Sequence, residues 1–334
     1  MELLASAWFV IIGFCIIMYV LLDGFDLGVG ILFPFFKRQD RDMMMSSILP
    51  LWDGNQTWLV LGGASLYGAF PLAFSLLLPA LYLPVFVMIL ALLFRSITFE
   101  FRFHSKTKLP VWDILFSIGS ILATLCQGLL LGSFVKGYEY VSGSAVLHYH
   151  LFAPFNIACA VALLFGYSLL GATWVIGKTT GVLQERMYQI AYTCLPIIAV
   201  FLALISFWTP LVDPRVMAIW FNPQHLPKLI ILPLVSGCLV VFFLYALYKK
   251  YEKILFALTI GIFLCAYVGF GISTWPYIIP RAVTIWEAAA PPDSQLFMIV
   301  GAVILLPVLL GYTFYAYYIF RGKVTKIVSE SLEY

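Results

Sequence analysis

The chain has 334 residues, of which 63% are hydrophobic and 10% are charged, and its mean hydropathy is +1.01. Soluble domains are about half apolar and about one-quarter charged, so this composition excludes a soluble globular fold. The formal net charge of +3 is too small to indicate a nucleic-acid partner. A bilayer accommodates this much apolar surface, because apolar side chains that face lipid incur no penalty.

Nine apolar segments are long enough to cross the hydrocarbon core of a bilayer, which takes about 20 helical residues. They cover residues 7–36, 55–76, 79–101, 112–134, 152–177, 187–209, 228–248, 255–278 and 295–320. The first is expected to stay as a membrane helix, because no basic region of a signal peptide precedes Ala7. The sequence predicts an all-α integral membrane protein with nine transmembrane helices, forming one polytopic membrane domain over residues 1–334.

Basic residues at the ends of the spans predict the orientation, because lysine and arginine concentrate in cytoplasmic loops. If the N-terminus lies outside, fifteen of the 19 basic residues fall on the inner side. These are Lys37, Arg38, Arg41, Arg95, Arg102, Lys106, Lys108, Lys178, Arg186, Lys249, Lys250, Lys253, Arg321, Lys323 and Lys326. The four outer ones are Lys136, Arg215, Lys228 and Arg281. The asymmetry predicts a periplasmic N-terminus and a cytoplasmic C-terminus.

Two carboxylates lie within the first span, in the run LLDGFDLGVG. Asp23 and Asp26 are three residues apart and therefore share one helix face. Counted inward from Phe36, Asp26 lies about 15 Å and Asp23 about 20 Å from the inner end. An unpaired carboxylate at that depth is costly. Two interpretations stay open: a proton or ion relay, or a structural hydrogen bond between helices, which the small-residue pattern of Gly24 and Gly28 favours.

The motif PLWDGNQTW, residues 50–58, leads from an inner loop into the second span. Asp53 or Asn55 could cap this helix, and Trp52 and Trp58 could anchor it at the membrane interface. A carboxylate at the cytoplasmic mouth with two more at depth on a neighbouring helix also matches what a proton input path requires. Such a path ends halfway across the membrane, so the chemistry at its end is expected on another subunit.

Histidine is the usual ligand of haem in membrane helices. The four histidines all lie in loops or at helix ends: His104, His148, His150 and His225. The HxH pair favours a solvated loop over a metal site, and all six cysteines lie in apolar runs where packing is the favoured role. The sequence predicts neither a haem or metal site nor a catalytic residue within this chain alone.

Four further charged residues have open or local interpretations. Glu100 lies near the inner end of the third span between two arginines, which favours an interfacial ion pair. Asp113 follows Pro110 at the start of the fourth span, where an acidic residue suits the helix dipole. Arg281 and Glu287 lie in the last outer loop and could face a partner.

Several of these runs resemble subunit II of the cytochrome bd-type quinol oxidases. They are DGFDLGVG, WDGNQTWLVLGGASLYGAFP, FRSITFEFR, WDILFSIGS, STWPYIIPRAVTIWEA and the C-terminal SLEY. The resemblance covers nearly the whole chain, and the first two runs are its most specific part. The short loops are most similar to those of the cyanide-insensitive branch.

The resemblance implies a bacterial inner-membrane complex that oxidises ubiquinol and reduces oxygen to water, electrogenic without pumping. Haems b and d are then expected in the partner subunit I, together with the quinol-oxidising loop, while subunit II stabilises subunit I, contributes part of a proton path and can hold a structural quinone. Small accessory membrane subunits and lipid are further implied partners. The family's acidic positions fall on Asp53, Asp23 and Asp26. Candidate contacts with a quinone or with the partner subunit are Trp52, Asn55, Trp58 and Glu100.

Two rival functions remain for the same residues. A proton- or cation-coupled secondary transporter would use Asp23 and Asp26 for exchange, although two matching halves with interrupted helices are not evident. A purely structural assembly subunit would tolerate amide substitution of all three aspartates. Co-purification with a haem-bearing subunit distinguishes the oxidase from a colourless transporter that acts alone.

Overall fold

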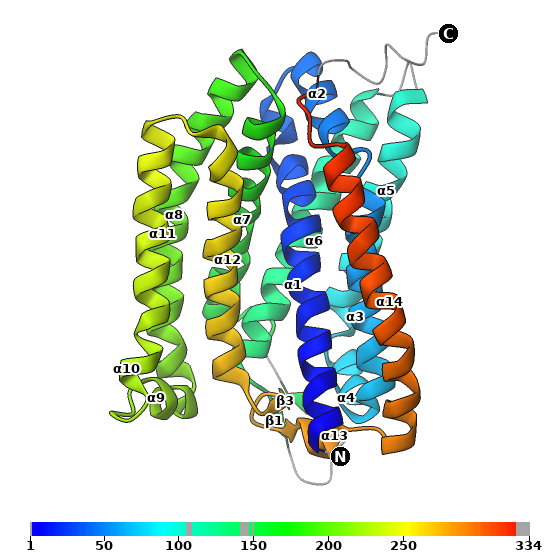
Figure 1. The fold of residues 1–334 in the computed structure, drawn as a ribbon, viewed down its shortest axis with the longest axis vertical. Coiled ribbons are helices and arrows are strands. Elements are labelled where there is room, and N and C mark those ends of the chain that lie inside the picture. Colours follow the sequence, from blue (N-terminus) through cyan, green and yellow to red (C-terminus); the bar gives the residue numbers. More distant parts are fainter. Residues whose placement is uncertain (1, 105–108, 141–146, 149, 325–334) are drawn as a thin grey trace.

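The computed structural model describes residues 2–104, 109–140, 147–148 and 150–324 (Figure 1). The helices are α1 (Glu2–Leu32), the 3-10 helix η1 (Phe33–Phe35), α2 (Arg38–Ile48), α3 (Trp52–Ala69), α4 (Pro71–Ala80), α5 (Tyr82–His104), α6 (Leu109–Lys136), α7 (Pro154–Lys178), α8 (Val182–Val212), α9 (Pro214–Trp220), α10 (Leu226–Leu229), α11 (Ile231–Tyr248), α12 (Glu252–Thr274), α13 (Ile285–Ala288) and α14 (Pro292–Ile319). The strands are β1 (Glu139–Tyr140), β2 (Leu147–His148), β3 (Tyr277–Ile279) and β4 (Val283–Thr284). The motif SLEY, with Lys106, Lys108 and Lys326, lies outside the described residues.

The predicted all-α membrane fold is confirmed. Among the described residues, eight helices are long and apolar enough to cross a membrane, or nine when the bent pair α3–α4 is counted as one span. The spans alternate in direction, from the first turn of α1 at one end of the bundle to the last turn of α14 at the other (Figure 1). We call the end where α1 finishes and α2 lies the basic end, because most lysines and arginines fall there.

The second span departs from the predicted single helix over residues 55–76. Helix α3 stops after Ala69, and α4 follows it at an angle of 119°. Pro71 is the first residue of α4, where its missing N–H is tolerated, but its ring disfavours continuation of α3. The third span consequently begins at Tyr82 rather than at Pro79. The other spans start and end within five residues of their predicted boundaries.

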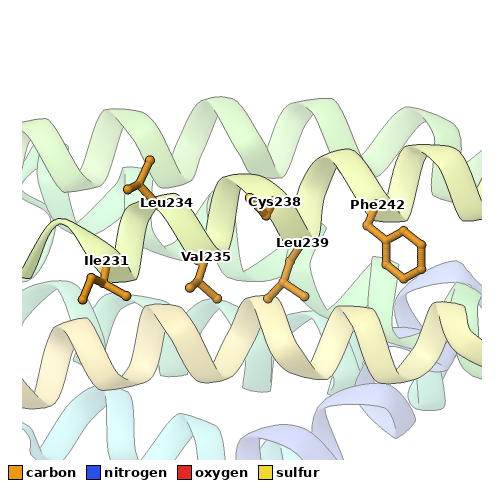
Figure 2. Close-up of a pocket in the computed structure, with 6 residues that line it drawn as sticks. All are labelled: Ile231, Leu234, Val235, Cys238, Leu239 and Phe242. Carbon is orange, nitrogen blue, oxygen red and sulfur yellow. The ribbon is translucent and has the colours of Figure 1, made fainter.

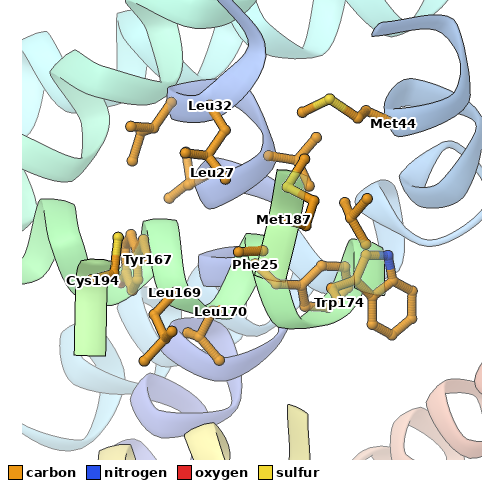
Figure 3. Close-up of a cluster of buried hydrophobic side chains, with 14 of the residues drawn as sticks. Phe25, Leu27, Leu32, Met44, Tyr167, Leu169, Leu170, Trp174, Met187 and Cys194 are labelled. Carbon is orange, nitrogen blue, oxygen red and sulfur yellow. The ribbon is translucent and has the colours of Figure 1, made fainter. Parts of the chain in front are cut away.

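Helices α1 and α7 cross at very close range. A Cβ on Gly28 would lie 1.8 Å from the backbone oxygen of Tyr167, and a Cβ on Gly171 would lie 2.5 Å from the carbonyl carbon of Gly28. Only glycines allow the two backbones to approach this closely. Next to this contact, Phe25 stacks on Trp174 with ring centroids 4.2 Å apart, inside the buried cluster shown in Figure 3. The close helix packing predicted from the small residues of the first span is confirmed.

The outer helices α11 and α14 are largely exposed: 11% and 6% of the residues in the most apolar stretches of these two spans are buried. They lie at opposite edges of the bundle in Figure 1. A groove of about 350 Å³ runs along α11 and is lined by apolar side chains, shown in Figure 2: Ile231, Leu234, Val235, Cys238, Leu239 and Phe242. In a bilayer such faces meet acyl chains or another membrane protein.

At the end of the bundle opposite the basic end, two antiparallel hairpins and short helices cover the spans. Strand β1 pairs with β2, and β3 pairs with β4. Arg281 in the second hairpin places its Nε 3.2 Å from Asp213 and donates from Nη2 to the backbone oxygen of Val212. Glu287 accepts from Thr284 in a capping box that starts α13. Both charged residues are therefore engaged within the chain, rather than turned only toward a partner.

Asp213 is 3% exposed and links the start of α9 to the β3–β4 hairpin. Its carboxylate accepts from the backbone N–H of Arg215 at 3.0 Å and from the Arg215 Nη2 at 2.9 Å, and it pairs with Arg281. Burial raises the pKa of Asp213, but the hydrogen bonds from Arg215 and the Arg281 guanidinium outweigh burial and hold the pKa below its ordinary value.

This lowered pKa predicts a pH dependence of stability. Asp213 binds fewer protons when folded than when unfolded, so its contribution is present above its unfolded pKa of about 3.9 and is lost as pH falls through the lower folded value. Thermal unfolding of the detergent-solubilised protein between neutral and acidic pH measures this. We expect Asp213→Asn to reduce the loss of stability at acidic pH, and an unchanged acid slope in that variant would contradict the expectation.

Candidate functional site

A fully buried ion pair links α1 to α5 inside the bundle. Arg95 donates from Nη2 to Oδ1 of Asp23, and both side chains are 0% exposed. Arg95 was counted among the basic residues at the inner ends of the spans, and this is wrong: α5 continues to His104, which places Arg95 about 13 Å inside the helix end. The charge asymmetry of the loops persists without it. Burial of an arginine in the membrane requires a counter-charge, and Asp23 supplies one.

The second aspartate of α1 has a neutral partner. Asn55 on α3 donates from Nδ2 to Oδ2 of Asp26 at 2.8 Å and to the backbone oxygen of Leu22 at 3.1 Å. The hydroxyl of Tyr317 on α14 donates to Oδ1 of Asn55 at 3.0 Å. The capping interpretation of Asn55 is wrong, because the N-cap of α3 is Leu51 and no side chain caps it. Asn55 instead connects three spans.

A third set of polar groups joins α1, α6 and α7, one turn of α1 before Asp23. The hydroxyl of Tyr167 donates to Oε1 of Gln127 at 2.7 Å, and Nε2 of Gln127 donates to the hydroxyl of Tyr19 at 2.8 Å. Tyr19 precedes Asp23 by four residues and shares its helix face. These three residues could not be predicted from the sequence, because a tyrosine or glutamine in an apolar span carries no signal of its partners.

Several buried polar atoms of the cluster lack a hydrogen-bond partner among the described residues. They are Oδ2 of Asp23, Oδ1 of Asp26, and Nε and Nη1 of Arg95. Buried polar atoms in proteins are nearly always hydrogen-bonded, to protein or to ordered water. The chemistry of these four atoms, two acceptors and two donors, fits water molecules bound between the carboxyl groups and the guanidinium.

Asp53 lies apart from this cluster. It is exposed on the first turn of α3, and because successive helical residues are rotated by 100°, it points away from Asn55, two residues on. The structure does not bring Asp53 into contact with Asp26. Gln56, three residues after Asp53, lies on the seam between α3 and α5, where its Oε1 accepts from the hydroxyl of Ser96 at 3.2 Å. The Nε2 of Gln56 is a further buried atom without a partner among the described residues.

The two tryptophans of the α3 motif occupy different environments. Trp58 is 0% exposed and packs edge-on against Phe14, with ring centroids 5.7 Å apart, so its interpretation as an interface anchor is wrong. Trp52 is half-buried and stacks on Phe99 of α5, with ring centroids 4.8 Å apart. Asn55 and Trp58 are enclosed by this chain, while Trp52 remains partly accessible.

Glu100 follows the stacked Phe99 and is exposed. The prediction that Glu100 forms an ion pair with its flanking arginines is wrong, because Arg95 and Arg102 pair with aspartates instead. Arg95 pairs with Asp23. Arg102 pairs with Asp113 at 2.6 Å and with Asp42 of α2 at 2.7 Å. Glu100 and Asp53 are thus two exposed carboxyl residues, each of which follows a member of the Trp52–Phe99 stack in the sequence.

The arginines of the basic end fix the interfacial helix α2. Arg41 reaches Asp113 at 2.9 Å and also donates to the backbone oxygen of Phe33 at 3.0 Å. Arg102 is 1% exposed and, like Arg41, lies over the ring of Phe33. Asp113 thus joins α2, α5 and α6, a wider role than the dipole contact predicted from its position.

The described residues do not fit a haem site. His104, His150 and His225 are exposed, and the side chain of His148 lies outside the described part of the chain. No group of three histidine, cysteine or acidic side chains is placed to hold a metal ion in the described residues. The buried cluster offers carboxyl, amide, guanidinium and phenol groups, and it contains no imidazole, the usual ligand of haem in membrane helices.

Comparisons with known proteins agree on one family. Residues 4–320 match the family model described as cytochrome bd terminal oxidase subunit II. The chain is 27% identical to the cytochrome bd-I ubiquinol oxidase subunit 2 of Escherichia coli strain K12, over 97% of this chain and 96% of that protein. It is also 27% identical to the cytochrome bd ubiquinol oxidase subunit 2 of Bacillus subtilis, over 97% of this chain and 98% of that protein. The fold matches a chain of the bd oxidase from Geobacillus thermodenitrificans with a TM-score of 0.76 at 15% identity, covering 95% of this chain and 98% of that chain.

Proposed function

Because the chain belongs to the cytochrome bd terminal oxidase subunit II family, we propose that it is the haem-free subunit of a bacterial inner-membrane complex that oxidises ubiquinol and reduces oxygen to water. The names of its relatives support ubiquinol as the reductant. The haems b and d reside in partner subunit I, which this chain stabilises through a shared membrane interface. The observation that carries its own role is the buried cluster of Asp23, Arg95 and Asp26, which suits proton transfer and offers no histidine for a haem.

In this proposal the cluster receives protons from the basic end of the bundle. Asp53 and the exposed Glu100 form the inlet, and the Gln56–Ser96 seam between α3 and α5 leads inward toward Arg95. Unpartnered polar atoms at Gln56 and in the cluster support bound water along this route. The route continues from the cluster to the partner subunit, where oxygen is reduced.

The basic end faces the cytoplasm in this proposal. Lysines and arginines concentrate there, as the positive-inside rule requires. Proton uptake from the cytoplasm, with release of quinol protons on the periplasmic side, makes turnover electrogenic without a pump.

The accessible contacts with subunit I, a structural quinone or lipid are Trp52 and Glu100, since Asn55 and Trp58 are 1% and 0% exposed within this chain. Small accessory membrane subunits have the exposed faces of α11 and α14 available. Family membership favours this function over a secondary transporter that exchanges ions through the same aspartates.

Asp53→Asn tests the inlet. The amide keeps the size of the side chain but cannot carry a proton, so we expect quinol-driven oxygen uptake by the complex to fall about tenfold or more. The haem absorbance spectrum of the complex should stay as in the wild type. Oxygen uptake is followed with an electrode on purified complex, and spectra are recorded on the same sample.

Asp293→Asn provides a matched control, because Asp293 is an exposed first-turn aspartate of α14 at the opposite end of the bundle. This variant should turn over at the wild-type rate. Near-normal turnover in Asp53→Asn would reject the inlet role of Asp53.

A further inference from the structure

The two buried aspartates of α1 differ in the charge of their partners. Asp23 is paired with the guanidinium of Arg95, whereas Asp26 accepts from the neutral amide of Asn55. One cation therefore stands against two carboxyl groups, all of them 0% exposed. A second uncompensated negative charge at this depth is costly, and a bound proton on one carboxyl group removes it.

The hydrogen bonds around Asp23 favour its charged form. Tyr167 donates to Gln127, and Gln127 donates to Tyr19, so the hydrogen of the Tyr19 hydroxyl remains free to point at Asp23, one turn along the same face. In this series of hydrogen bonds, each donor points to the next residue in the order Tyr167, Gln127, Tyr19, and so toward the carboxylate of Asp23. The amide of Gln127 keeps both its hydrogens, so this series of hydrogen bonds does not conduct protons. It stabilises the negative charge of Asp23 instead.

The surroundings of Asp26 tolerate both of its protonation states. Tyr317 donates to Oδ1 of Asn55, which turns the Asn55 amide nitrogen toward Asp26. Oδ2 of Asp26 can accept this hydrogen bond whether or not the carboxyl group is protonated. Its other oxygen, Oδ1, has no partner among the described residues and is free to carry a hydrogen.

We propose that the two aspartates have different roles: Asp23 is the permanent counter-ion of Arg95, and Asp26 is the carboxyl group that takes up and releases the proton. This assignment rests on the proposed function. A hydrated proton adds to Oδ1 of Asp26, and the new O–H bond breaks again when the proton passes to the next water molecule. The cluster thereby alternates between a net charge of zero and minus one. Oδ1 of Asp26 and Oδ2 of Asp23 both lack a hydrogen-bond partner among the described residues, so a water molecule bound to Oδ1 of Asp26 would deliver and accept the proton.

The other groups that face the pair are accounted for on every helix packed around it. They are Tyr19 on α1, Asn55 on α3, Arg95 on α5, Gln127 on α6, Tyr167 on α7 and Tyr317 on α14. Arg95 is the one cation among them and stays charged throughout. Asp26 is thus the one carboxyl group of this set without a cationic partner.

Infrared difference spectroscopy of the whole complex, recorded as the pH is changed, reports the protonated carboxyl group directly through its C=O stretch. Several carboxyl groups of the complex contribute to this spectrum, and we expect one of the wild-type bands to disappear in Asp26→Asn. The band should remain in the double variant Asp23→Asn/Arg95→Gln, which removes both members of the ion pair and so leaves neither of them as an unpaired buried charge. Retention of every wild-type band in Asp26→Asn, or loss of this band in the double variant, would overturn the assignment.

Turnover separates this assignment from the proposed function. We expect quinol-driven oxygen uptake to fall about 100-fold in Asp26→Asn. The double variant Asp23→Asn/Arg95→Gln should lose less activity than Asp26→Asn. Equal losses in the two assembled variants would overturn the division of roles but keep the relay. Wild-type proton uptake in Asp26→Asn would reject the relay itself. If the double variant does not assemble, the infrared comparison of wild type and Asp26→Asn still decides which aspartate carries the proton.

Discussion

Arg95→Gln alone is expected to destabilise the folded chain by about 3–5 kcal/mol, because it leaves the carboxylate of Asp23 buried without its counter-charge. Both side chains are fully buried, so neither solvent nor salt can compensate. The measurement is the yield of assembled, haem-containing complex together with its thermal unfolding temperature in mild detergent. Adding Asp23→Asn to this variant should restore much of the yield.

Arg186→Gln is the matched control for this loss. Arg186 is 44% exposed, and its nearest carboxylate, Asp40, lies 3.9 Å away. Exposed pairs of this kind contribute at most about 1 kcal/mol, so the control should assemble normally. If Arg95→Gln were as stable as Arg186→Gln, the buried ion pair would have no structural role.

Gly28→Ala is expected to separate α1 from α7. The added methyl group would lie 1.8 Å from the backbone oxygen of Tyr167, and a backbone atom cannot move aside as a flexible side chain can. We expect a destabilisation of about 3 kcal/mol, at the upper end of the usual cost of overpacking. The free energy of unfolding and the yield of complex measure it.

Gly63→Ala offers the same change without the clash, because a Cβ placed on Gly63 of α3 has no described atom within 4 Å apart from those of its chain neighbours and its own helix backbone. A methyl group there should leave stability unchanged or raise it slightly, since alanine favours helix more than glycine does. Equal stabilities of the Gly28 and Gly63 variants would show that α1 and α7 are not in backbone contact.

The fold was largely predictable, because the length of an apolar segment shows whether it can cross the membrane, and the distribution of lysine and arginine indicates how successive segments alternate. The bend between α3 and α4 was not predicted, since Pro71 sits inside a continuous apolar run and hydropathy carries no direction. The end of α12 at Thr274 was placed four residues too late for a similar reason: the residues of β3 are as apolar as those of the span. Composition identifies which residues are in the membrane, and local backbone chemistry decides where a helix turns.

The candidate site was predictable only in its carboxyl groups. A buried aspartate is conspicuous in an apolar span, so Asp23 and Asp26 were found from the sequence. Arg95 was missed as their counter-charge because its position near Arg102 made it look like a loop residue. Tyr317 hydrogen-bonds to Asn55 across 262 residues of sequence, a contact that no local pattern could indicate.

Proton uptake during a single pulse of quinol oxidation tests the account most directly. The complex is reconstituted in vesicles with a pH-sensitive dye on the side of the basic end, and proton consumption there is followed as oxygen is reduced. If Asp53 and Asp26 relay protons, the rate of this uptake should fall about 100-fold in Asp26→Asn and should also fall in Asp53→Asn, while the haems are still reduced by quinol. Wild-type rates of uptake in both variants would contradict it.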